Sequence, residues 1–384
     1  MTGERDATLL TRRYTIRIRH ETDVRKNGLA TGLHSLYQLH FPASHADRSL
    51  EMNRPPREFK YIPVEQLRAL GTSCLQAAGM PEEHAQQLAH LLSNSDLRGV
   101  RSHGTRALYG YCKTIRDGGV NPTPDITIVK ETDTSILVDG DGSLGYAPTM
   151  LATEKAIKKA KEKGIAVGAA RCIGHYGSAG HYVRRAMEEG CTAYSVQGAY
   201  PQYYASNEGK RAAHYGNPPL CFGFPGQEEA PVILDGATCI LADYQRGEEF
   251  EALESQIPAA FFKSMGYTAI GTLLGGAFVG QADPHAGEIA QRWPRARLGG
   301  IVVVMDLGLF APADQVRRSV DQLSQRAAEE MIPVDGYDET TLPGGIEHRF
   351  ENEYRQTGIP VGKDELERLE SCADDLGVPV PWRS

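Results

Sequence analysis

The sequence of 384 residues lacks the features that mark a membrane protein or a nucleic-acid-binding protein. Its longest apolar stretch, residues 265–280, is too short and too rich in glycine to cross a bilayer. Its net charge of −8 gives no excess of basic side chains that would attract phosphate groups. We therefore expect no nucleic-acid partner and no membrane partner.

Paired cysteines are also missing. The seven cysteines are scattered, odd in number and never arranged as a Cys-x-x-Cys pair. This arrangement is typical of reduced thiols in a cytoplasmic protein rather than of a disulfide framework. Cys172 and His175 have the spacing of half a zinc site, but no second pair follows at a known zinc spacing. We therefore expect a cytoplasmic protein without a bound metal.

Two common catalytic fingerprints are absent as well. No Gly-x-Ser-x-Gly stretch occurs, which argues against a serine hydrolase with a nucleophile elbow. The glycine-rich segment 174–180, GHYGSAG, has a GxxGxxG spacing where the dinucleotide fingerprint needs GxGxxG. The strand that should follow it ends in Gln197 rather than in an acidic residue. An ordinary Rossmann site is therefore not expected, and the segment is either a tight turn without a ligand or, through His175, part of a site.

The sequence does contain a regular alternation of helical and strand-like segments. Apolar residues at helical spacing predict helices near both ends, over 63–79, 81–99, 314–331 and 363–377. The middle predicts a β-hairpin over 126–138, helix 143–164, strand 165–173, helix 181–190 and strand 191–198. Runs of β-branched residues predict two further buried strands, 231–236 and 299–310.

This order predicts a mixed α/β protein in three parts. Residues 1–58 are polar and aperiodic after one short alternating stretch, so we expect a poorly ordered extension. Residues 59–125 together with 311–384 predict a helical domain built from both chain ends. Residues 126–310 predict an α/β domain.

Ser102 and His103 stand just before a helix-like stretch. A lone histidine is most often a surface or capping residue. A hydroxyl beside an imidazole can, however, fix its tautomer, and a histidine that titrates near neutral pH can give or take a proton. His103 is therefore a candidate acid or base, with Ser102 as the residue that orients it.

Several motifs, taken in order, resemble those of one known family. They are DLRGVRSHG (96–104), GGVNP (118–122), LVDGDGSLG (137–145), GHYGSAGHY (174–182), VILDGAT (232–238) and FKSMGYTAIGTLLGGAFVG (262–280). From Tyr61 to Gly377 the chain resembles the type-2 malate/L-lactate dehydrogenase family. This family also includes ureidoglycolate, sulfolactate and diketogulonate dehydrogenases or reductases, and cyclic-imine carboxylate reductases.

The resemblance implies a fold, a reaction and an assembly. The fold would be a non-Rossmann mixed-sheet domain that binds NAD or NADP, next to a helical domain built from both chain ends. The reaction would be hydride transfer between the nicotinamide and a small 2-hydroxy or 2-oxo acid, with a small carboxylate as substrate. The protein would be a homodimer.

The resemblance also implies roles for individual residues. His103 would donate and accept the proton, and Ser102 would orient it. Asp235 would support the acid/base group or contact the cofactor, and Lys263 would contact the cofactor. His175, with Gly177 and Gly180 in the same turn, would lie in the cofactor pocket, and some members assign the proton transfer to this histidine instead.

Two departures from the family pattern leave alternatives open. Ala107 stands where an arginine usually follows the histidine. Arg106, one place earlier, is the candidate for the substrate carboxylate, although one residue along a helix turns a side chain by about 100°. The segment between Asp235 and Lys263 is also shorter than in the family. A catalytically silent homologue that keeps the fold as a binding or assembly module is therefore one alternative, and a cyclic-imine carboxylate reductase is another.

Overall fold

The computed structural model describes residues 55–200, 217–240, 248–333 and 339–383. The predicted extension, 1–58, lies outside these ranges except for its last residues. Residues 43–384 group into one compact unit, so the division near 126 and 310 stays a prediction.

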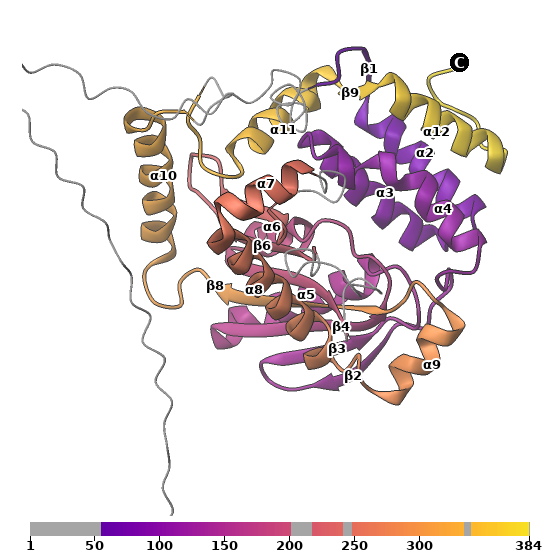
Figure 1. Cartoon of the computed structure of the whole chain (residues 1–384), viewed down its shortest axis with the longest axis horizontal. Coiled ribbons are helices and arrows are strands. Elements are labelled where there is room, and N and C mark those ends of the chain that lie inside the picture. Colours follow the sequence, from indigo (N-terminus) through magenta and orange to yellow (C-terminus); the bar gives the residue numbers. More distant parts are fainter. Residues whose placement is uncertain (1–54, 201–216, 241–247, 334–338, 384) are drawn as a thin grey trace, which may run out of the picture. The chain divides into compact units, whose positions relative to one another are not determined.

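A seven-stranded mixed sheet forms the centre of the fold (Figure 1). Its strands in spatial order are β2 (Thr127–Glu131), β3 (Ser135–Asp139), β4 (Ile165–Ile173), β8 (Leu298–Asp306), β5 (Cys191–Ala199), β6 (Pro219–Phe224) and β7 (Val232–Ala237). Only β3 and β4 pair in parallel, and all other neighbours are antiparallel. The predicted mixed α/β fold without a Rossmann sheet is confirmed.

The strands on either side of helix α6 (Gly180–Glu188) are not neighbours in the sheet. β4 and β5 run parallel to each other, but β8 lies between them and pairs antiparallel with both. The sequence pattern of strand, helix and strand correctly predicted the elements, whereas a simple βαβ unit would have placed them side by side. β8 is buried over most of its length because it has a strand on each side and helices on both faces.

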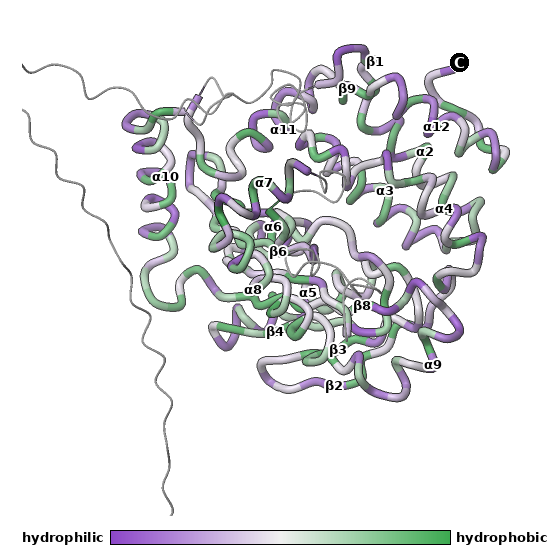
Figure 2. The backbone as a smooth tube through the Cα atoms, in the orientation of Figure 1, coloured by the Kyte–Doolittle hydropathy of each residue, from purple (hydrophilic) through white to green (hydrophobic). Residues whose placement is uncertain are grey.

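Two groups of helices cover the sheet. α5 (Tyr146–Lys163) and α6 pack on one face, and α8 (Pro258–Gly275) packs on the other. The neighbouring residues Gly299 and Gly300 of β8 show this division. Gly299 faces the backbone of α8, whereas Gly300 faces α5 and the ring of Tyr176. Figure 2 shows hydrophobic stretches along α8 and the strands near it.

The contact of α8 with the sheet depends on glycine. A Cβ atom on Gly198 of β5 would overlap the carbonyl group of Gly271, and one on Gly275 would overlap the backbone of Gly198. Helix and strand backbones therefore touch directly here. This explains why residues 265–280 are both apolar and rich in glycine. No helix in the described ranges is long and apolar enough to span a membrane.

Elements from both chain ends pack together (Figure 1). β1 (Phe59–Ile62) pairs antiparallel with β9 (Ile359–Gly362). The helices in this group are α2 (Val64–Ala77), α3 (Glu82–Leu97), α4 (Leu108–Arg116), α11 (Gly345–Thr357) and α12 (Lys363–Leu376). The buried thiols of Cys74 and Cys112 both contact that of Cys372, where α2, α4 and α12 meet.

The remaining helices are α7 (Glu248–Gln256), α9 (Pro284–Arg292) and α10 (Ala313–Glu330). Asp321 on α10 accepts backbone N–H groups from residues 227–229, so α10 is tied to the loop between β6 and β7. All seven cysteines are free thiols, as the sequence predicted.

The glycine contact predicts opposite effects for two alanine substitutions. Gly275→Ala should lower the free energy of unfolding by about 1–3 kcal/mol, because a methyl group has no room between the two backbones. Gly287→Ala in α9 should raise it by about 0.5–1 kcal/mol, because that position is open and alanine favours a helix. Urea denaturation of both variants measures the difference. Equal stability would contradict the packing described here.

Candidate active site

His103 lies in a short 3-10 turn rather than at the first turn of an α-helix. Residues Arg101–His103 and Thr105–Ala107 form two such turns, and helix α4 begins only at Leu108. Gly104 between them is extended, which interrupts the helix. Ser102 Oγ lies 2.9 Å from His103 Nδ1, so the predicted pair is in contact and the second ring nitrogen, Nε2, is left for another partner.

A buried carboxyl group holds this loop in place. Asp96, on α3 and only 4% exposed, accepts the backbone N–H of Thr105 at 2.8 Å. The side chain fills the space beside Gly104, where any Cβ atom would overlap it. Burial raises the pKa of Asp96 to about 7, although the hydrogen bonds from Thr105 act in the opposite direction. The position of His103 therefore depends on a group that titrates near neutral pH.

His175 brings a second imidazole to the same place. It lies in the turn between β4 and α6, and its ring centre is 5.9 Å from that of His103. The turn is held by buried Gln197, whose Nε2 donates to the carbonyl of Gly174 at 3.0 Å. Gln197, which argued against a dinucleotide fingerprint, is therefore a support for the turn.

Two tyrosines extend the histidine pair. The Tyr111 hydroxyl lies 2.7 Å from His175 Nδ1 and 2.9 Å from the hydroxyl of Tyr146. Burial raises the pKa of Tyr111 to about 12, so the phenol stays protonated at neutral pH. Burial and the nearby charge of His103 lower the pKa of His175 to about 4. His175 is therefore a neutral imidazole at neutral pH.

Asp235, on the edge strand β7, binds the first residues of α6. Its Oδ2 accepts the hydroxyl of Ser178 and, at 3.1 Å, the backbone N–H of Gly180. A carboxylate at the start of a helix is favoured by the helix dipole. Burial lowers the pKa of His103, whereas the charge of Asp235 raises it. The structure thus brings together His103, His175 and Asp235, which the resemblance assigned to one site, and their roles stay a prediction.

The two glycines of the turn are covered by protein. Gly177 has φ +81° and lies against the ring of Tyr146. Gly180 lies against the carboxylate of Asp235, which occupies the space of a Cβ atom. The first N–H of α6 is therefore already bound to a negative group. Contacts of these glycines with a cofactor stay a prediction.

Arg106 and Lys263 lie away from the histidine pair. Arg106 is half exposed, and its Nη1 lies 4.0 Å from Glu365 Oε1 on α12. Lys263 is exposed on α8, next to Ser264, whose hydroxyl donates to the carbonyl of Thr238 at 2.6 Å. No contact in the described part of the chain joins either side chain to the histidines.

Three side chains of the site were missed from the sequence. Tyr111 and Tyr146 belong to helical segments where they match the apolar pattern. His181 on α6 is only 5% exposed, and its Nε2 has no hydrogen-bond partner among the residues that the structure describes. Burial lowers its pKa well below the usual range. Its ring centre is 5.9 Å from that of Tyr146. Only its place six residues after His175 in GHYGSAGHY could have indicated it.

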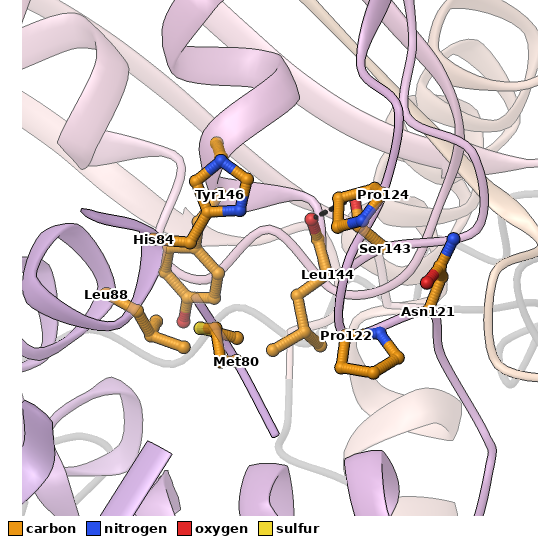
Figure 3. Close-up of a pocket in the computed structure, with 10 residues that line it drawn as sticks. Met80, His84, Leu88, Asn121, Pro122, Pro124, Ser143, Leu144 and Tyr146 are labelled. Atoms are coloured by element: carbon orange, nitrogen blue, oxygen red, sulfur yellow. Dashed lines mark hydrogen bonds between the residues drawn. The ribbon is translucent and has the colours of Figure 1, made fainter. Parts of the chain in front are cut away.

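A small pocket lies behind Tyr146 (Figure 3). Its lining includes Met80, His84, Leu88, Leu144 and Tyr146. Its volume of about 20 Å³ leaves room for about one water molecule. His103 and His175 are not part of the lining. The pocket is therefore a packing gap next to Tyr146 rather than a substrate cavity.

A second group of side chains has ligand character. Asp139, Cys172 and His285 each place one ligand atom within 4.8 Å of the others. Asp139 Oδ2 lies 3.0 Å from both Arg171 Nε and His285 Nε2. Because the guanidinium group already compensates the carboxylate, we assign no cation to this group.

Comparison with known proteins finds a family model and related sequences that match this chain. A family model described as malate/L-lactate dehydrogenase matches residues 62–247. An L-sulfolactate dehydrogenase of Methanocaldococcus jannaschii is 30% identical over 336 residues, which cover 80% of this chain and 94% of the relative. A ureidoglycolate dehydrogenase (NAD(+)) of Escherichia coli O157:H7 is 26% identical over 81% of this chain and 95% of its own length.

The solved structure of a malate dehydrogenase from Pyrococcus horikoshii has the same fold. It superposes with a TM-score of 0.70 over 86% of this chain and 99% of that chain, at 24% identity. At this identity the likeness concerns the fold alone.

The buried Asp96 predicts a pH-dependent change in stability. The unfolded chain loses this proton near pH 4 and the folded protein near pH 7, so the folded state binds more protons between these values. The contribution of Asp96 to the free energy of unfolding therefore falls as pH rises from 4 to 7. Asp96→Asn does not titrate. From pH 4 to pH 7, its free energy of unfolding should therefore rise by roughly 2–4 kcal/mol relative to that of the wild type.

Urea denaturation at pH 5 and pH 8 measures the effect. The free energy of unfolding of Asp96→Asn minus that of the wild type should be higher at pH 8 than at pH 5. The same difference at both pH values would show that Asp96 titrates normally.

Proposed function

Because this chain belongs to the malate/L-lactate dehydrogenase family, we propose that it transfers a hydride between NAD or NADP and a small 2-hydroxy or 2-oxo acid. The observation that carries the proposal is the pair of imidazoles, His103 and His175, whose ring centres are 5.9 Å apart. A bound nicotinamide supplies or accepts the hydride. The protein has to orient the substrate and move one proton.

His103 is the proton donor in reduction and the acceptor in oxidation. Ser102 Oγ contacts Nδ1, so Nε2 points to a different partner. Burial lowers the pKa of His103, but the charge of Asp235 opposes this effect. Its imidazolium form is therefore more accessible than that of His175, whose pKa is about 4. A residue that can both donate and accept a proton suits a reversible carbonyl reduction.

His175 is a neutral hydrogen-bond donor to the substrate oxygen. When Tyr146 donates to Tyr111 and Tyr111 donates to His175, Nδ1 accepts and Nε2 carries the proton. The ring can then donate from Nε2 without a charge of its own. This division gives each histidine one task, with His103 moving the proton and His175 positioning the carbonyl.

The residues near Asp235 fit a nicotinamide riboside better than a phosphate. The start of α6 is taken by the Asp235 carboxylate, which would repel a pyrophosphate group at that place. A carboxylate accepts hydrogen bonds from ribose hydroxyls, so Asp235 would hold the sugar next to the nicotinamide. Gly177 and Gly180 would act by allowing Tyr146 and Asp235 to approach. Lys263 would attract the phosphates from the exposed side of α8.

We expect a homodimer in a reducing compartment such as the cytoplasm. Seven free thiols suit such a compartment. Phe262, Ile270 and Leu273 lie on one side of α8 and are 71%, 54% and 53% exposed, and Phe278 beyond it is 73% exposed. A patch of large apolar side chains of this kind is typical of a subunit interface.

The first experiment is a titration with NADH and with NADPH, followed by calorimetry, on the wild type and on Lys263→Ala. We expect micromolar binding of one or both cofactors, weakened at least tenfold by Lys263→Ala because a charge partner of the phosphates is lost. No binding of either cofactor at millimolar concentration would contradict the proposal. The remaining alternative would then be a catalytically silent homologue that keeps the fold as a binding or assembly module.

The second experiment is steady-state reduction of a panel of 2-oxo acids and cyclic-imine carboxylates. His103→Ala should lower kcat by about 10²–10⁴ without changing cofactor affinity, because only the proton transfer is lost. The wild-type rate of reduction should fall with rising pH, with a midpoint below 6.5, because the pKa of His103 is lowered from that value. His348→Ala, on α11, is the matched control.

A third experiment tests the dimer. Light scattering should give twice the chain mass of 42.0 kDa for the wild type. Phe262→Glu combined with Ile270→Glu should give the monomer mass, because two charges would be buried in the interface. Leu323→Glu on α10, at a position equally exposed in the chain, should leave the dimer intact. A wild-type monomer would rule this assembly out.

A further inference from the structure

Arg184 lies on the part of α6 that carries the candidate site. It follows Gly180 by four residues and His181 by three, and residues at these spacings are neighbours on one face of a helix. The N–H of Gly180 donates to Asp235 at 3.1 Å. The side chain of Arg184 therefore starts next to His181 and close to the Asp235 carboxylate.

Arg184 differs from Arg98 and Arg185 in having no bonded partner within the described ranges. Arg98 Nε lies 2.8 Å from Glu351 Oε2, and Arg185 Nε lies 2.6 Å from Glu154 Oε1. Arg184 makes no hydrogen bond or ion pair with any residue that the structure describes. Its side chain is only partly exposed. A guanidinium group that is partly withdrawn from water and has no bonded anion is available to an anion from outside the chain.

The surrounding charges keep this guanidinium cationic. Burial lowers the pKa of Arg184 to about 10, and the charge of Arg98 acts in the same direction. Asp235 and Glu351 raise it. Glu351 is bound to Arg98, and Asp235 Oδ2 is bound to Ser178 and Gly180, and neither carboxylate forms a hydrogen bond with Arg184.

Arg106, the residue that the sequence favoured for this task, lies near a carboxylate of a different helix. Its nearest charged partner is Glu365 at 4.0 Å, on the first turn of α12. The position where the family usually has an arginine is Ala107. In the described part of the chain, no contact joins the arginine of the loop after His103 to the histidine pair.

We propose that Arg184, from helix α6, binds the carboxylate of the substrate next to the carbonyl that His103 and His175 contact. The inference rests on the proposed function. A guanidinium group can hold a carboxylate through two parallel hydrogen bonds, which fixes the orientation of the neighbouring carbonyl. The substrate class is then a 2-oxo acid with a free carboxylate, and the corresponding amide or ester is a poor substrate.

The test uses oxamate, an unreactive analogue of a 2-oxo acid, and oxamide, its uncharged counterpart. Calorimetry measures their binding to the enzyme with NADH bound. The wild type should bind oxamate far more tightly than oxamide. Arg184→Met should weaken oxamate binding about 100-fold, leave oxamide binding unchanged and leave the affinity for NADH within twofold.

Two further variants make the result specific. Arg184→Lys keeps the charge but loses the planar fork, so oxamate binding should fall about tenfold; this variant decides the matter if Arg184→Met does not fold. Arg185→Met removes the neighbouring arginine of the same helix, which pairs with Glu154, and should bind oxamate as the wild type does. The KM for the best 2-oxo acid should follow the same order.

The outcomes separate this inference from its premise. A wild type that binds NADH and reduces 2-oxo acids, while Arg184→Met keeps its oxamate affinity, overturns the inference alone. A loss of NADH affinity in Arg184→Met, with oxamate binding intact, also overturns it and assigns the arginine to the cofactor phosphates. A wild type that binds no cofactor overturns both.

Discussion

The candidate site depends on one contact, in which Asp235 binds the start of α6. β7, the edge strand that carries Asp235, is separated from β4 by three other strands in the sheet order. The carboxylate nevertheless reaches the turn that follows β4, through Ser178 and Gly180. This contact fixes the turn that carries His175 and the helix that carries His181 and Arg184. It also places a negative charge where it can act on His103.

The two histidines come from parts of the chain with different packing. His103 sits on a loop between α3 and α4, among the elements that join the two chain ends, whereas His175 belongs to the sheet. Tyr111 of α4 bridges the two parts, because its hydroxyl contacts both His175 and Tyr146. A movement of the terminal helices relative to the sheet would therefore change the distance between the imidazoles.

The sequence predicted which segments form helices and strands better than it predicted which strands lie side by side in the sheet. Helices such as 81–99 and strands such as 165–173 have clear periodicity, but nothing local indicates that β8 is inserted between β4 and β5. The resemblance to a known family assigned His103, His175 and Asp235 to one site, and the structure places them close together. His181 and Arg184 were missed because a helical segment of mixed polarity does not show which side chains face the protein and find no hydrogen-bond partner among the described residues. That property arises only from the packing of α6 against the sheet.

The position of β8 also determines when the sheet can form. β2, β3 and β4 pair with one another, and so do β5, β6 and β7, but no strand pair joins these two halves except through β8. During synthesis more than a hundred residues are added after β4 before β8 leaves the ribosome. Until then each half has an open edge, where an unrelated chain could pair. Assembly of the sheet is therefore a late, long-range event, and the nascent chain is exposed to aggregation while the segment between β4 and β8 is made.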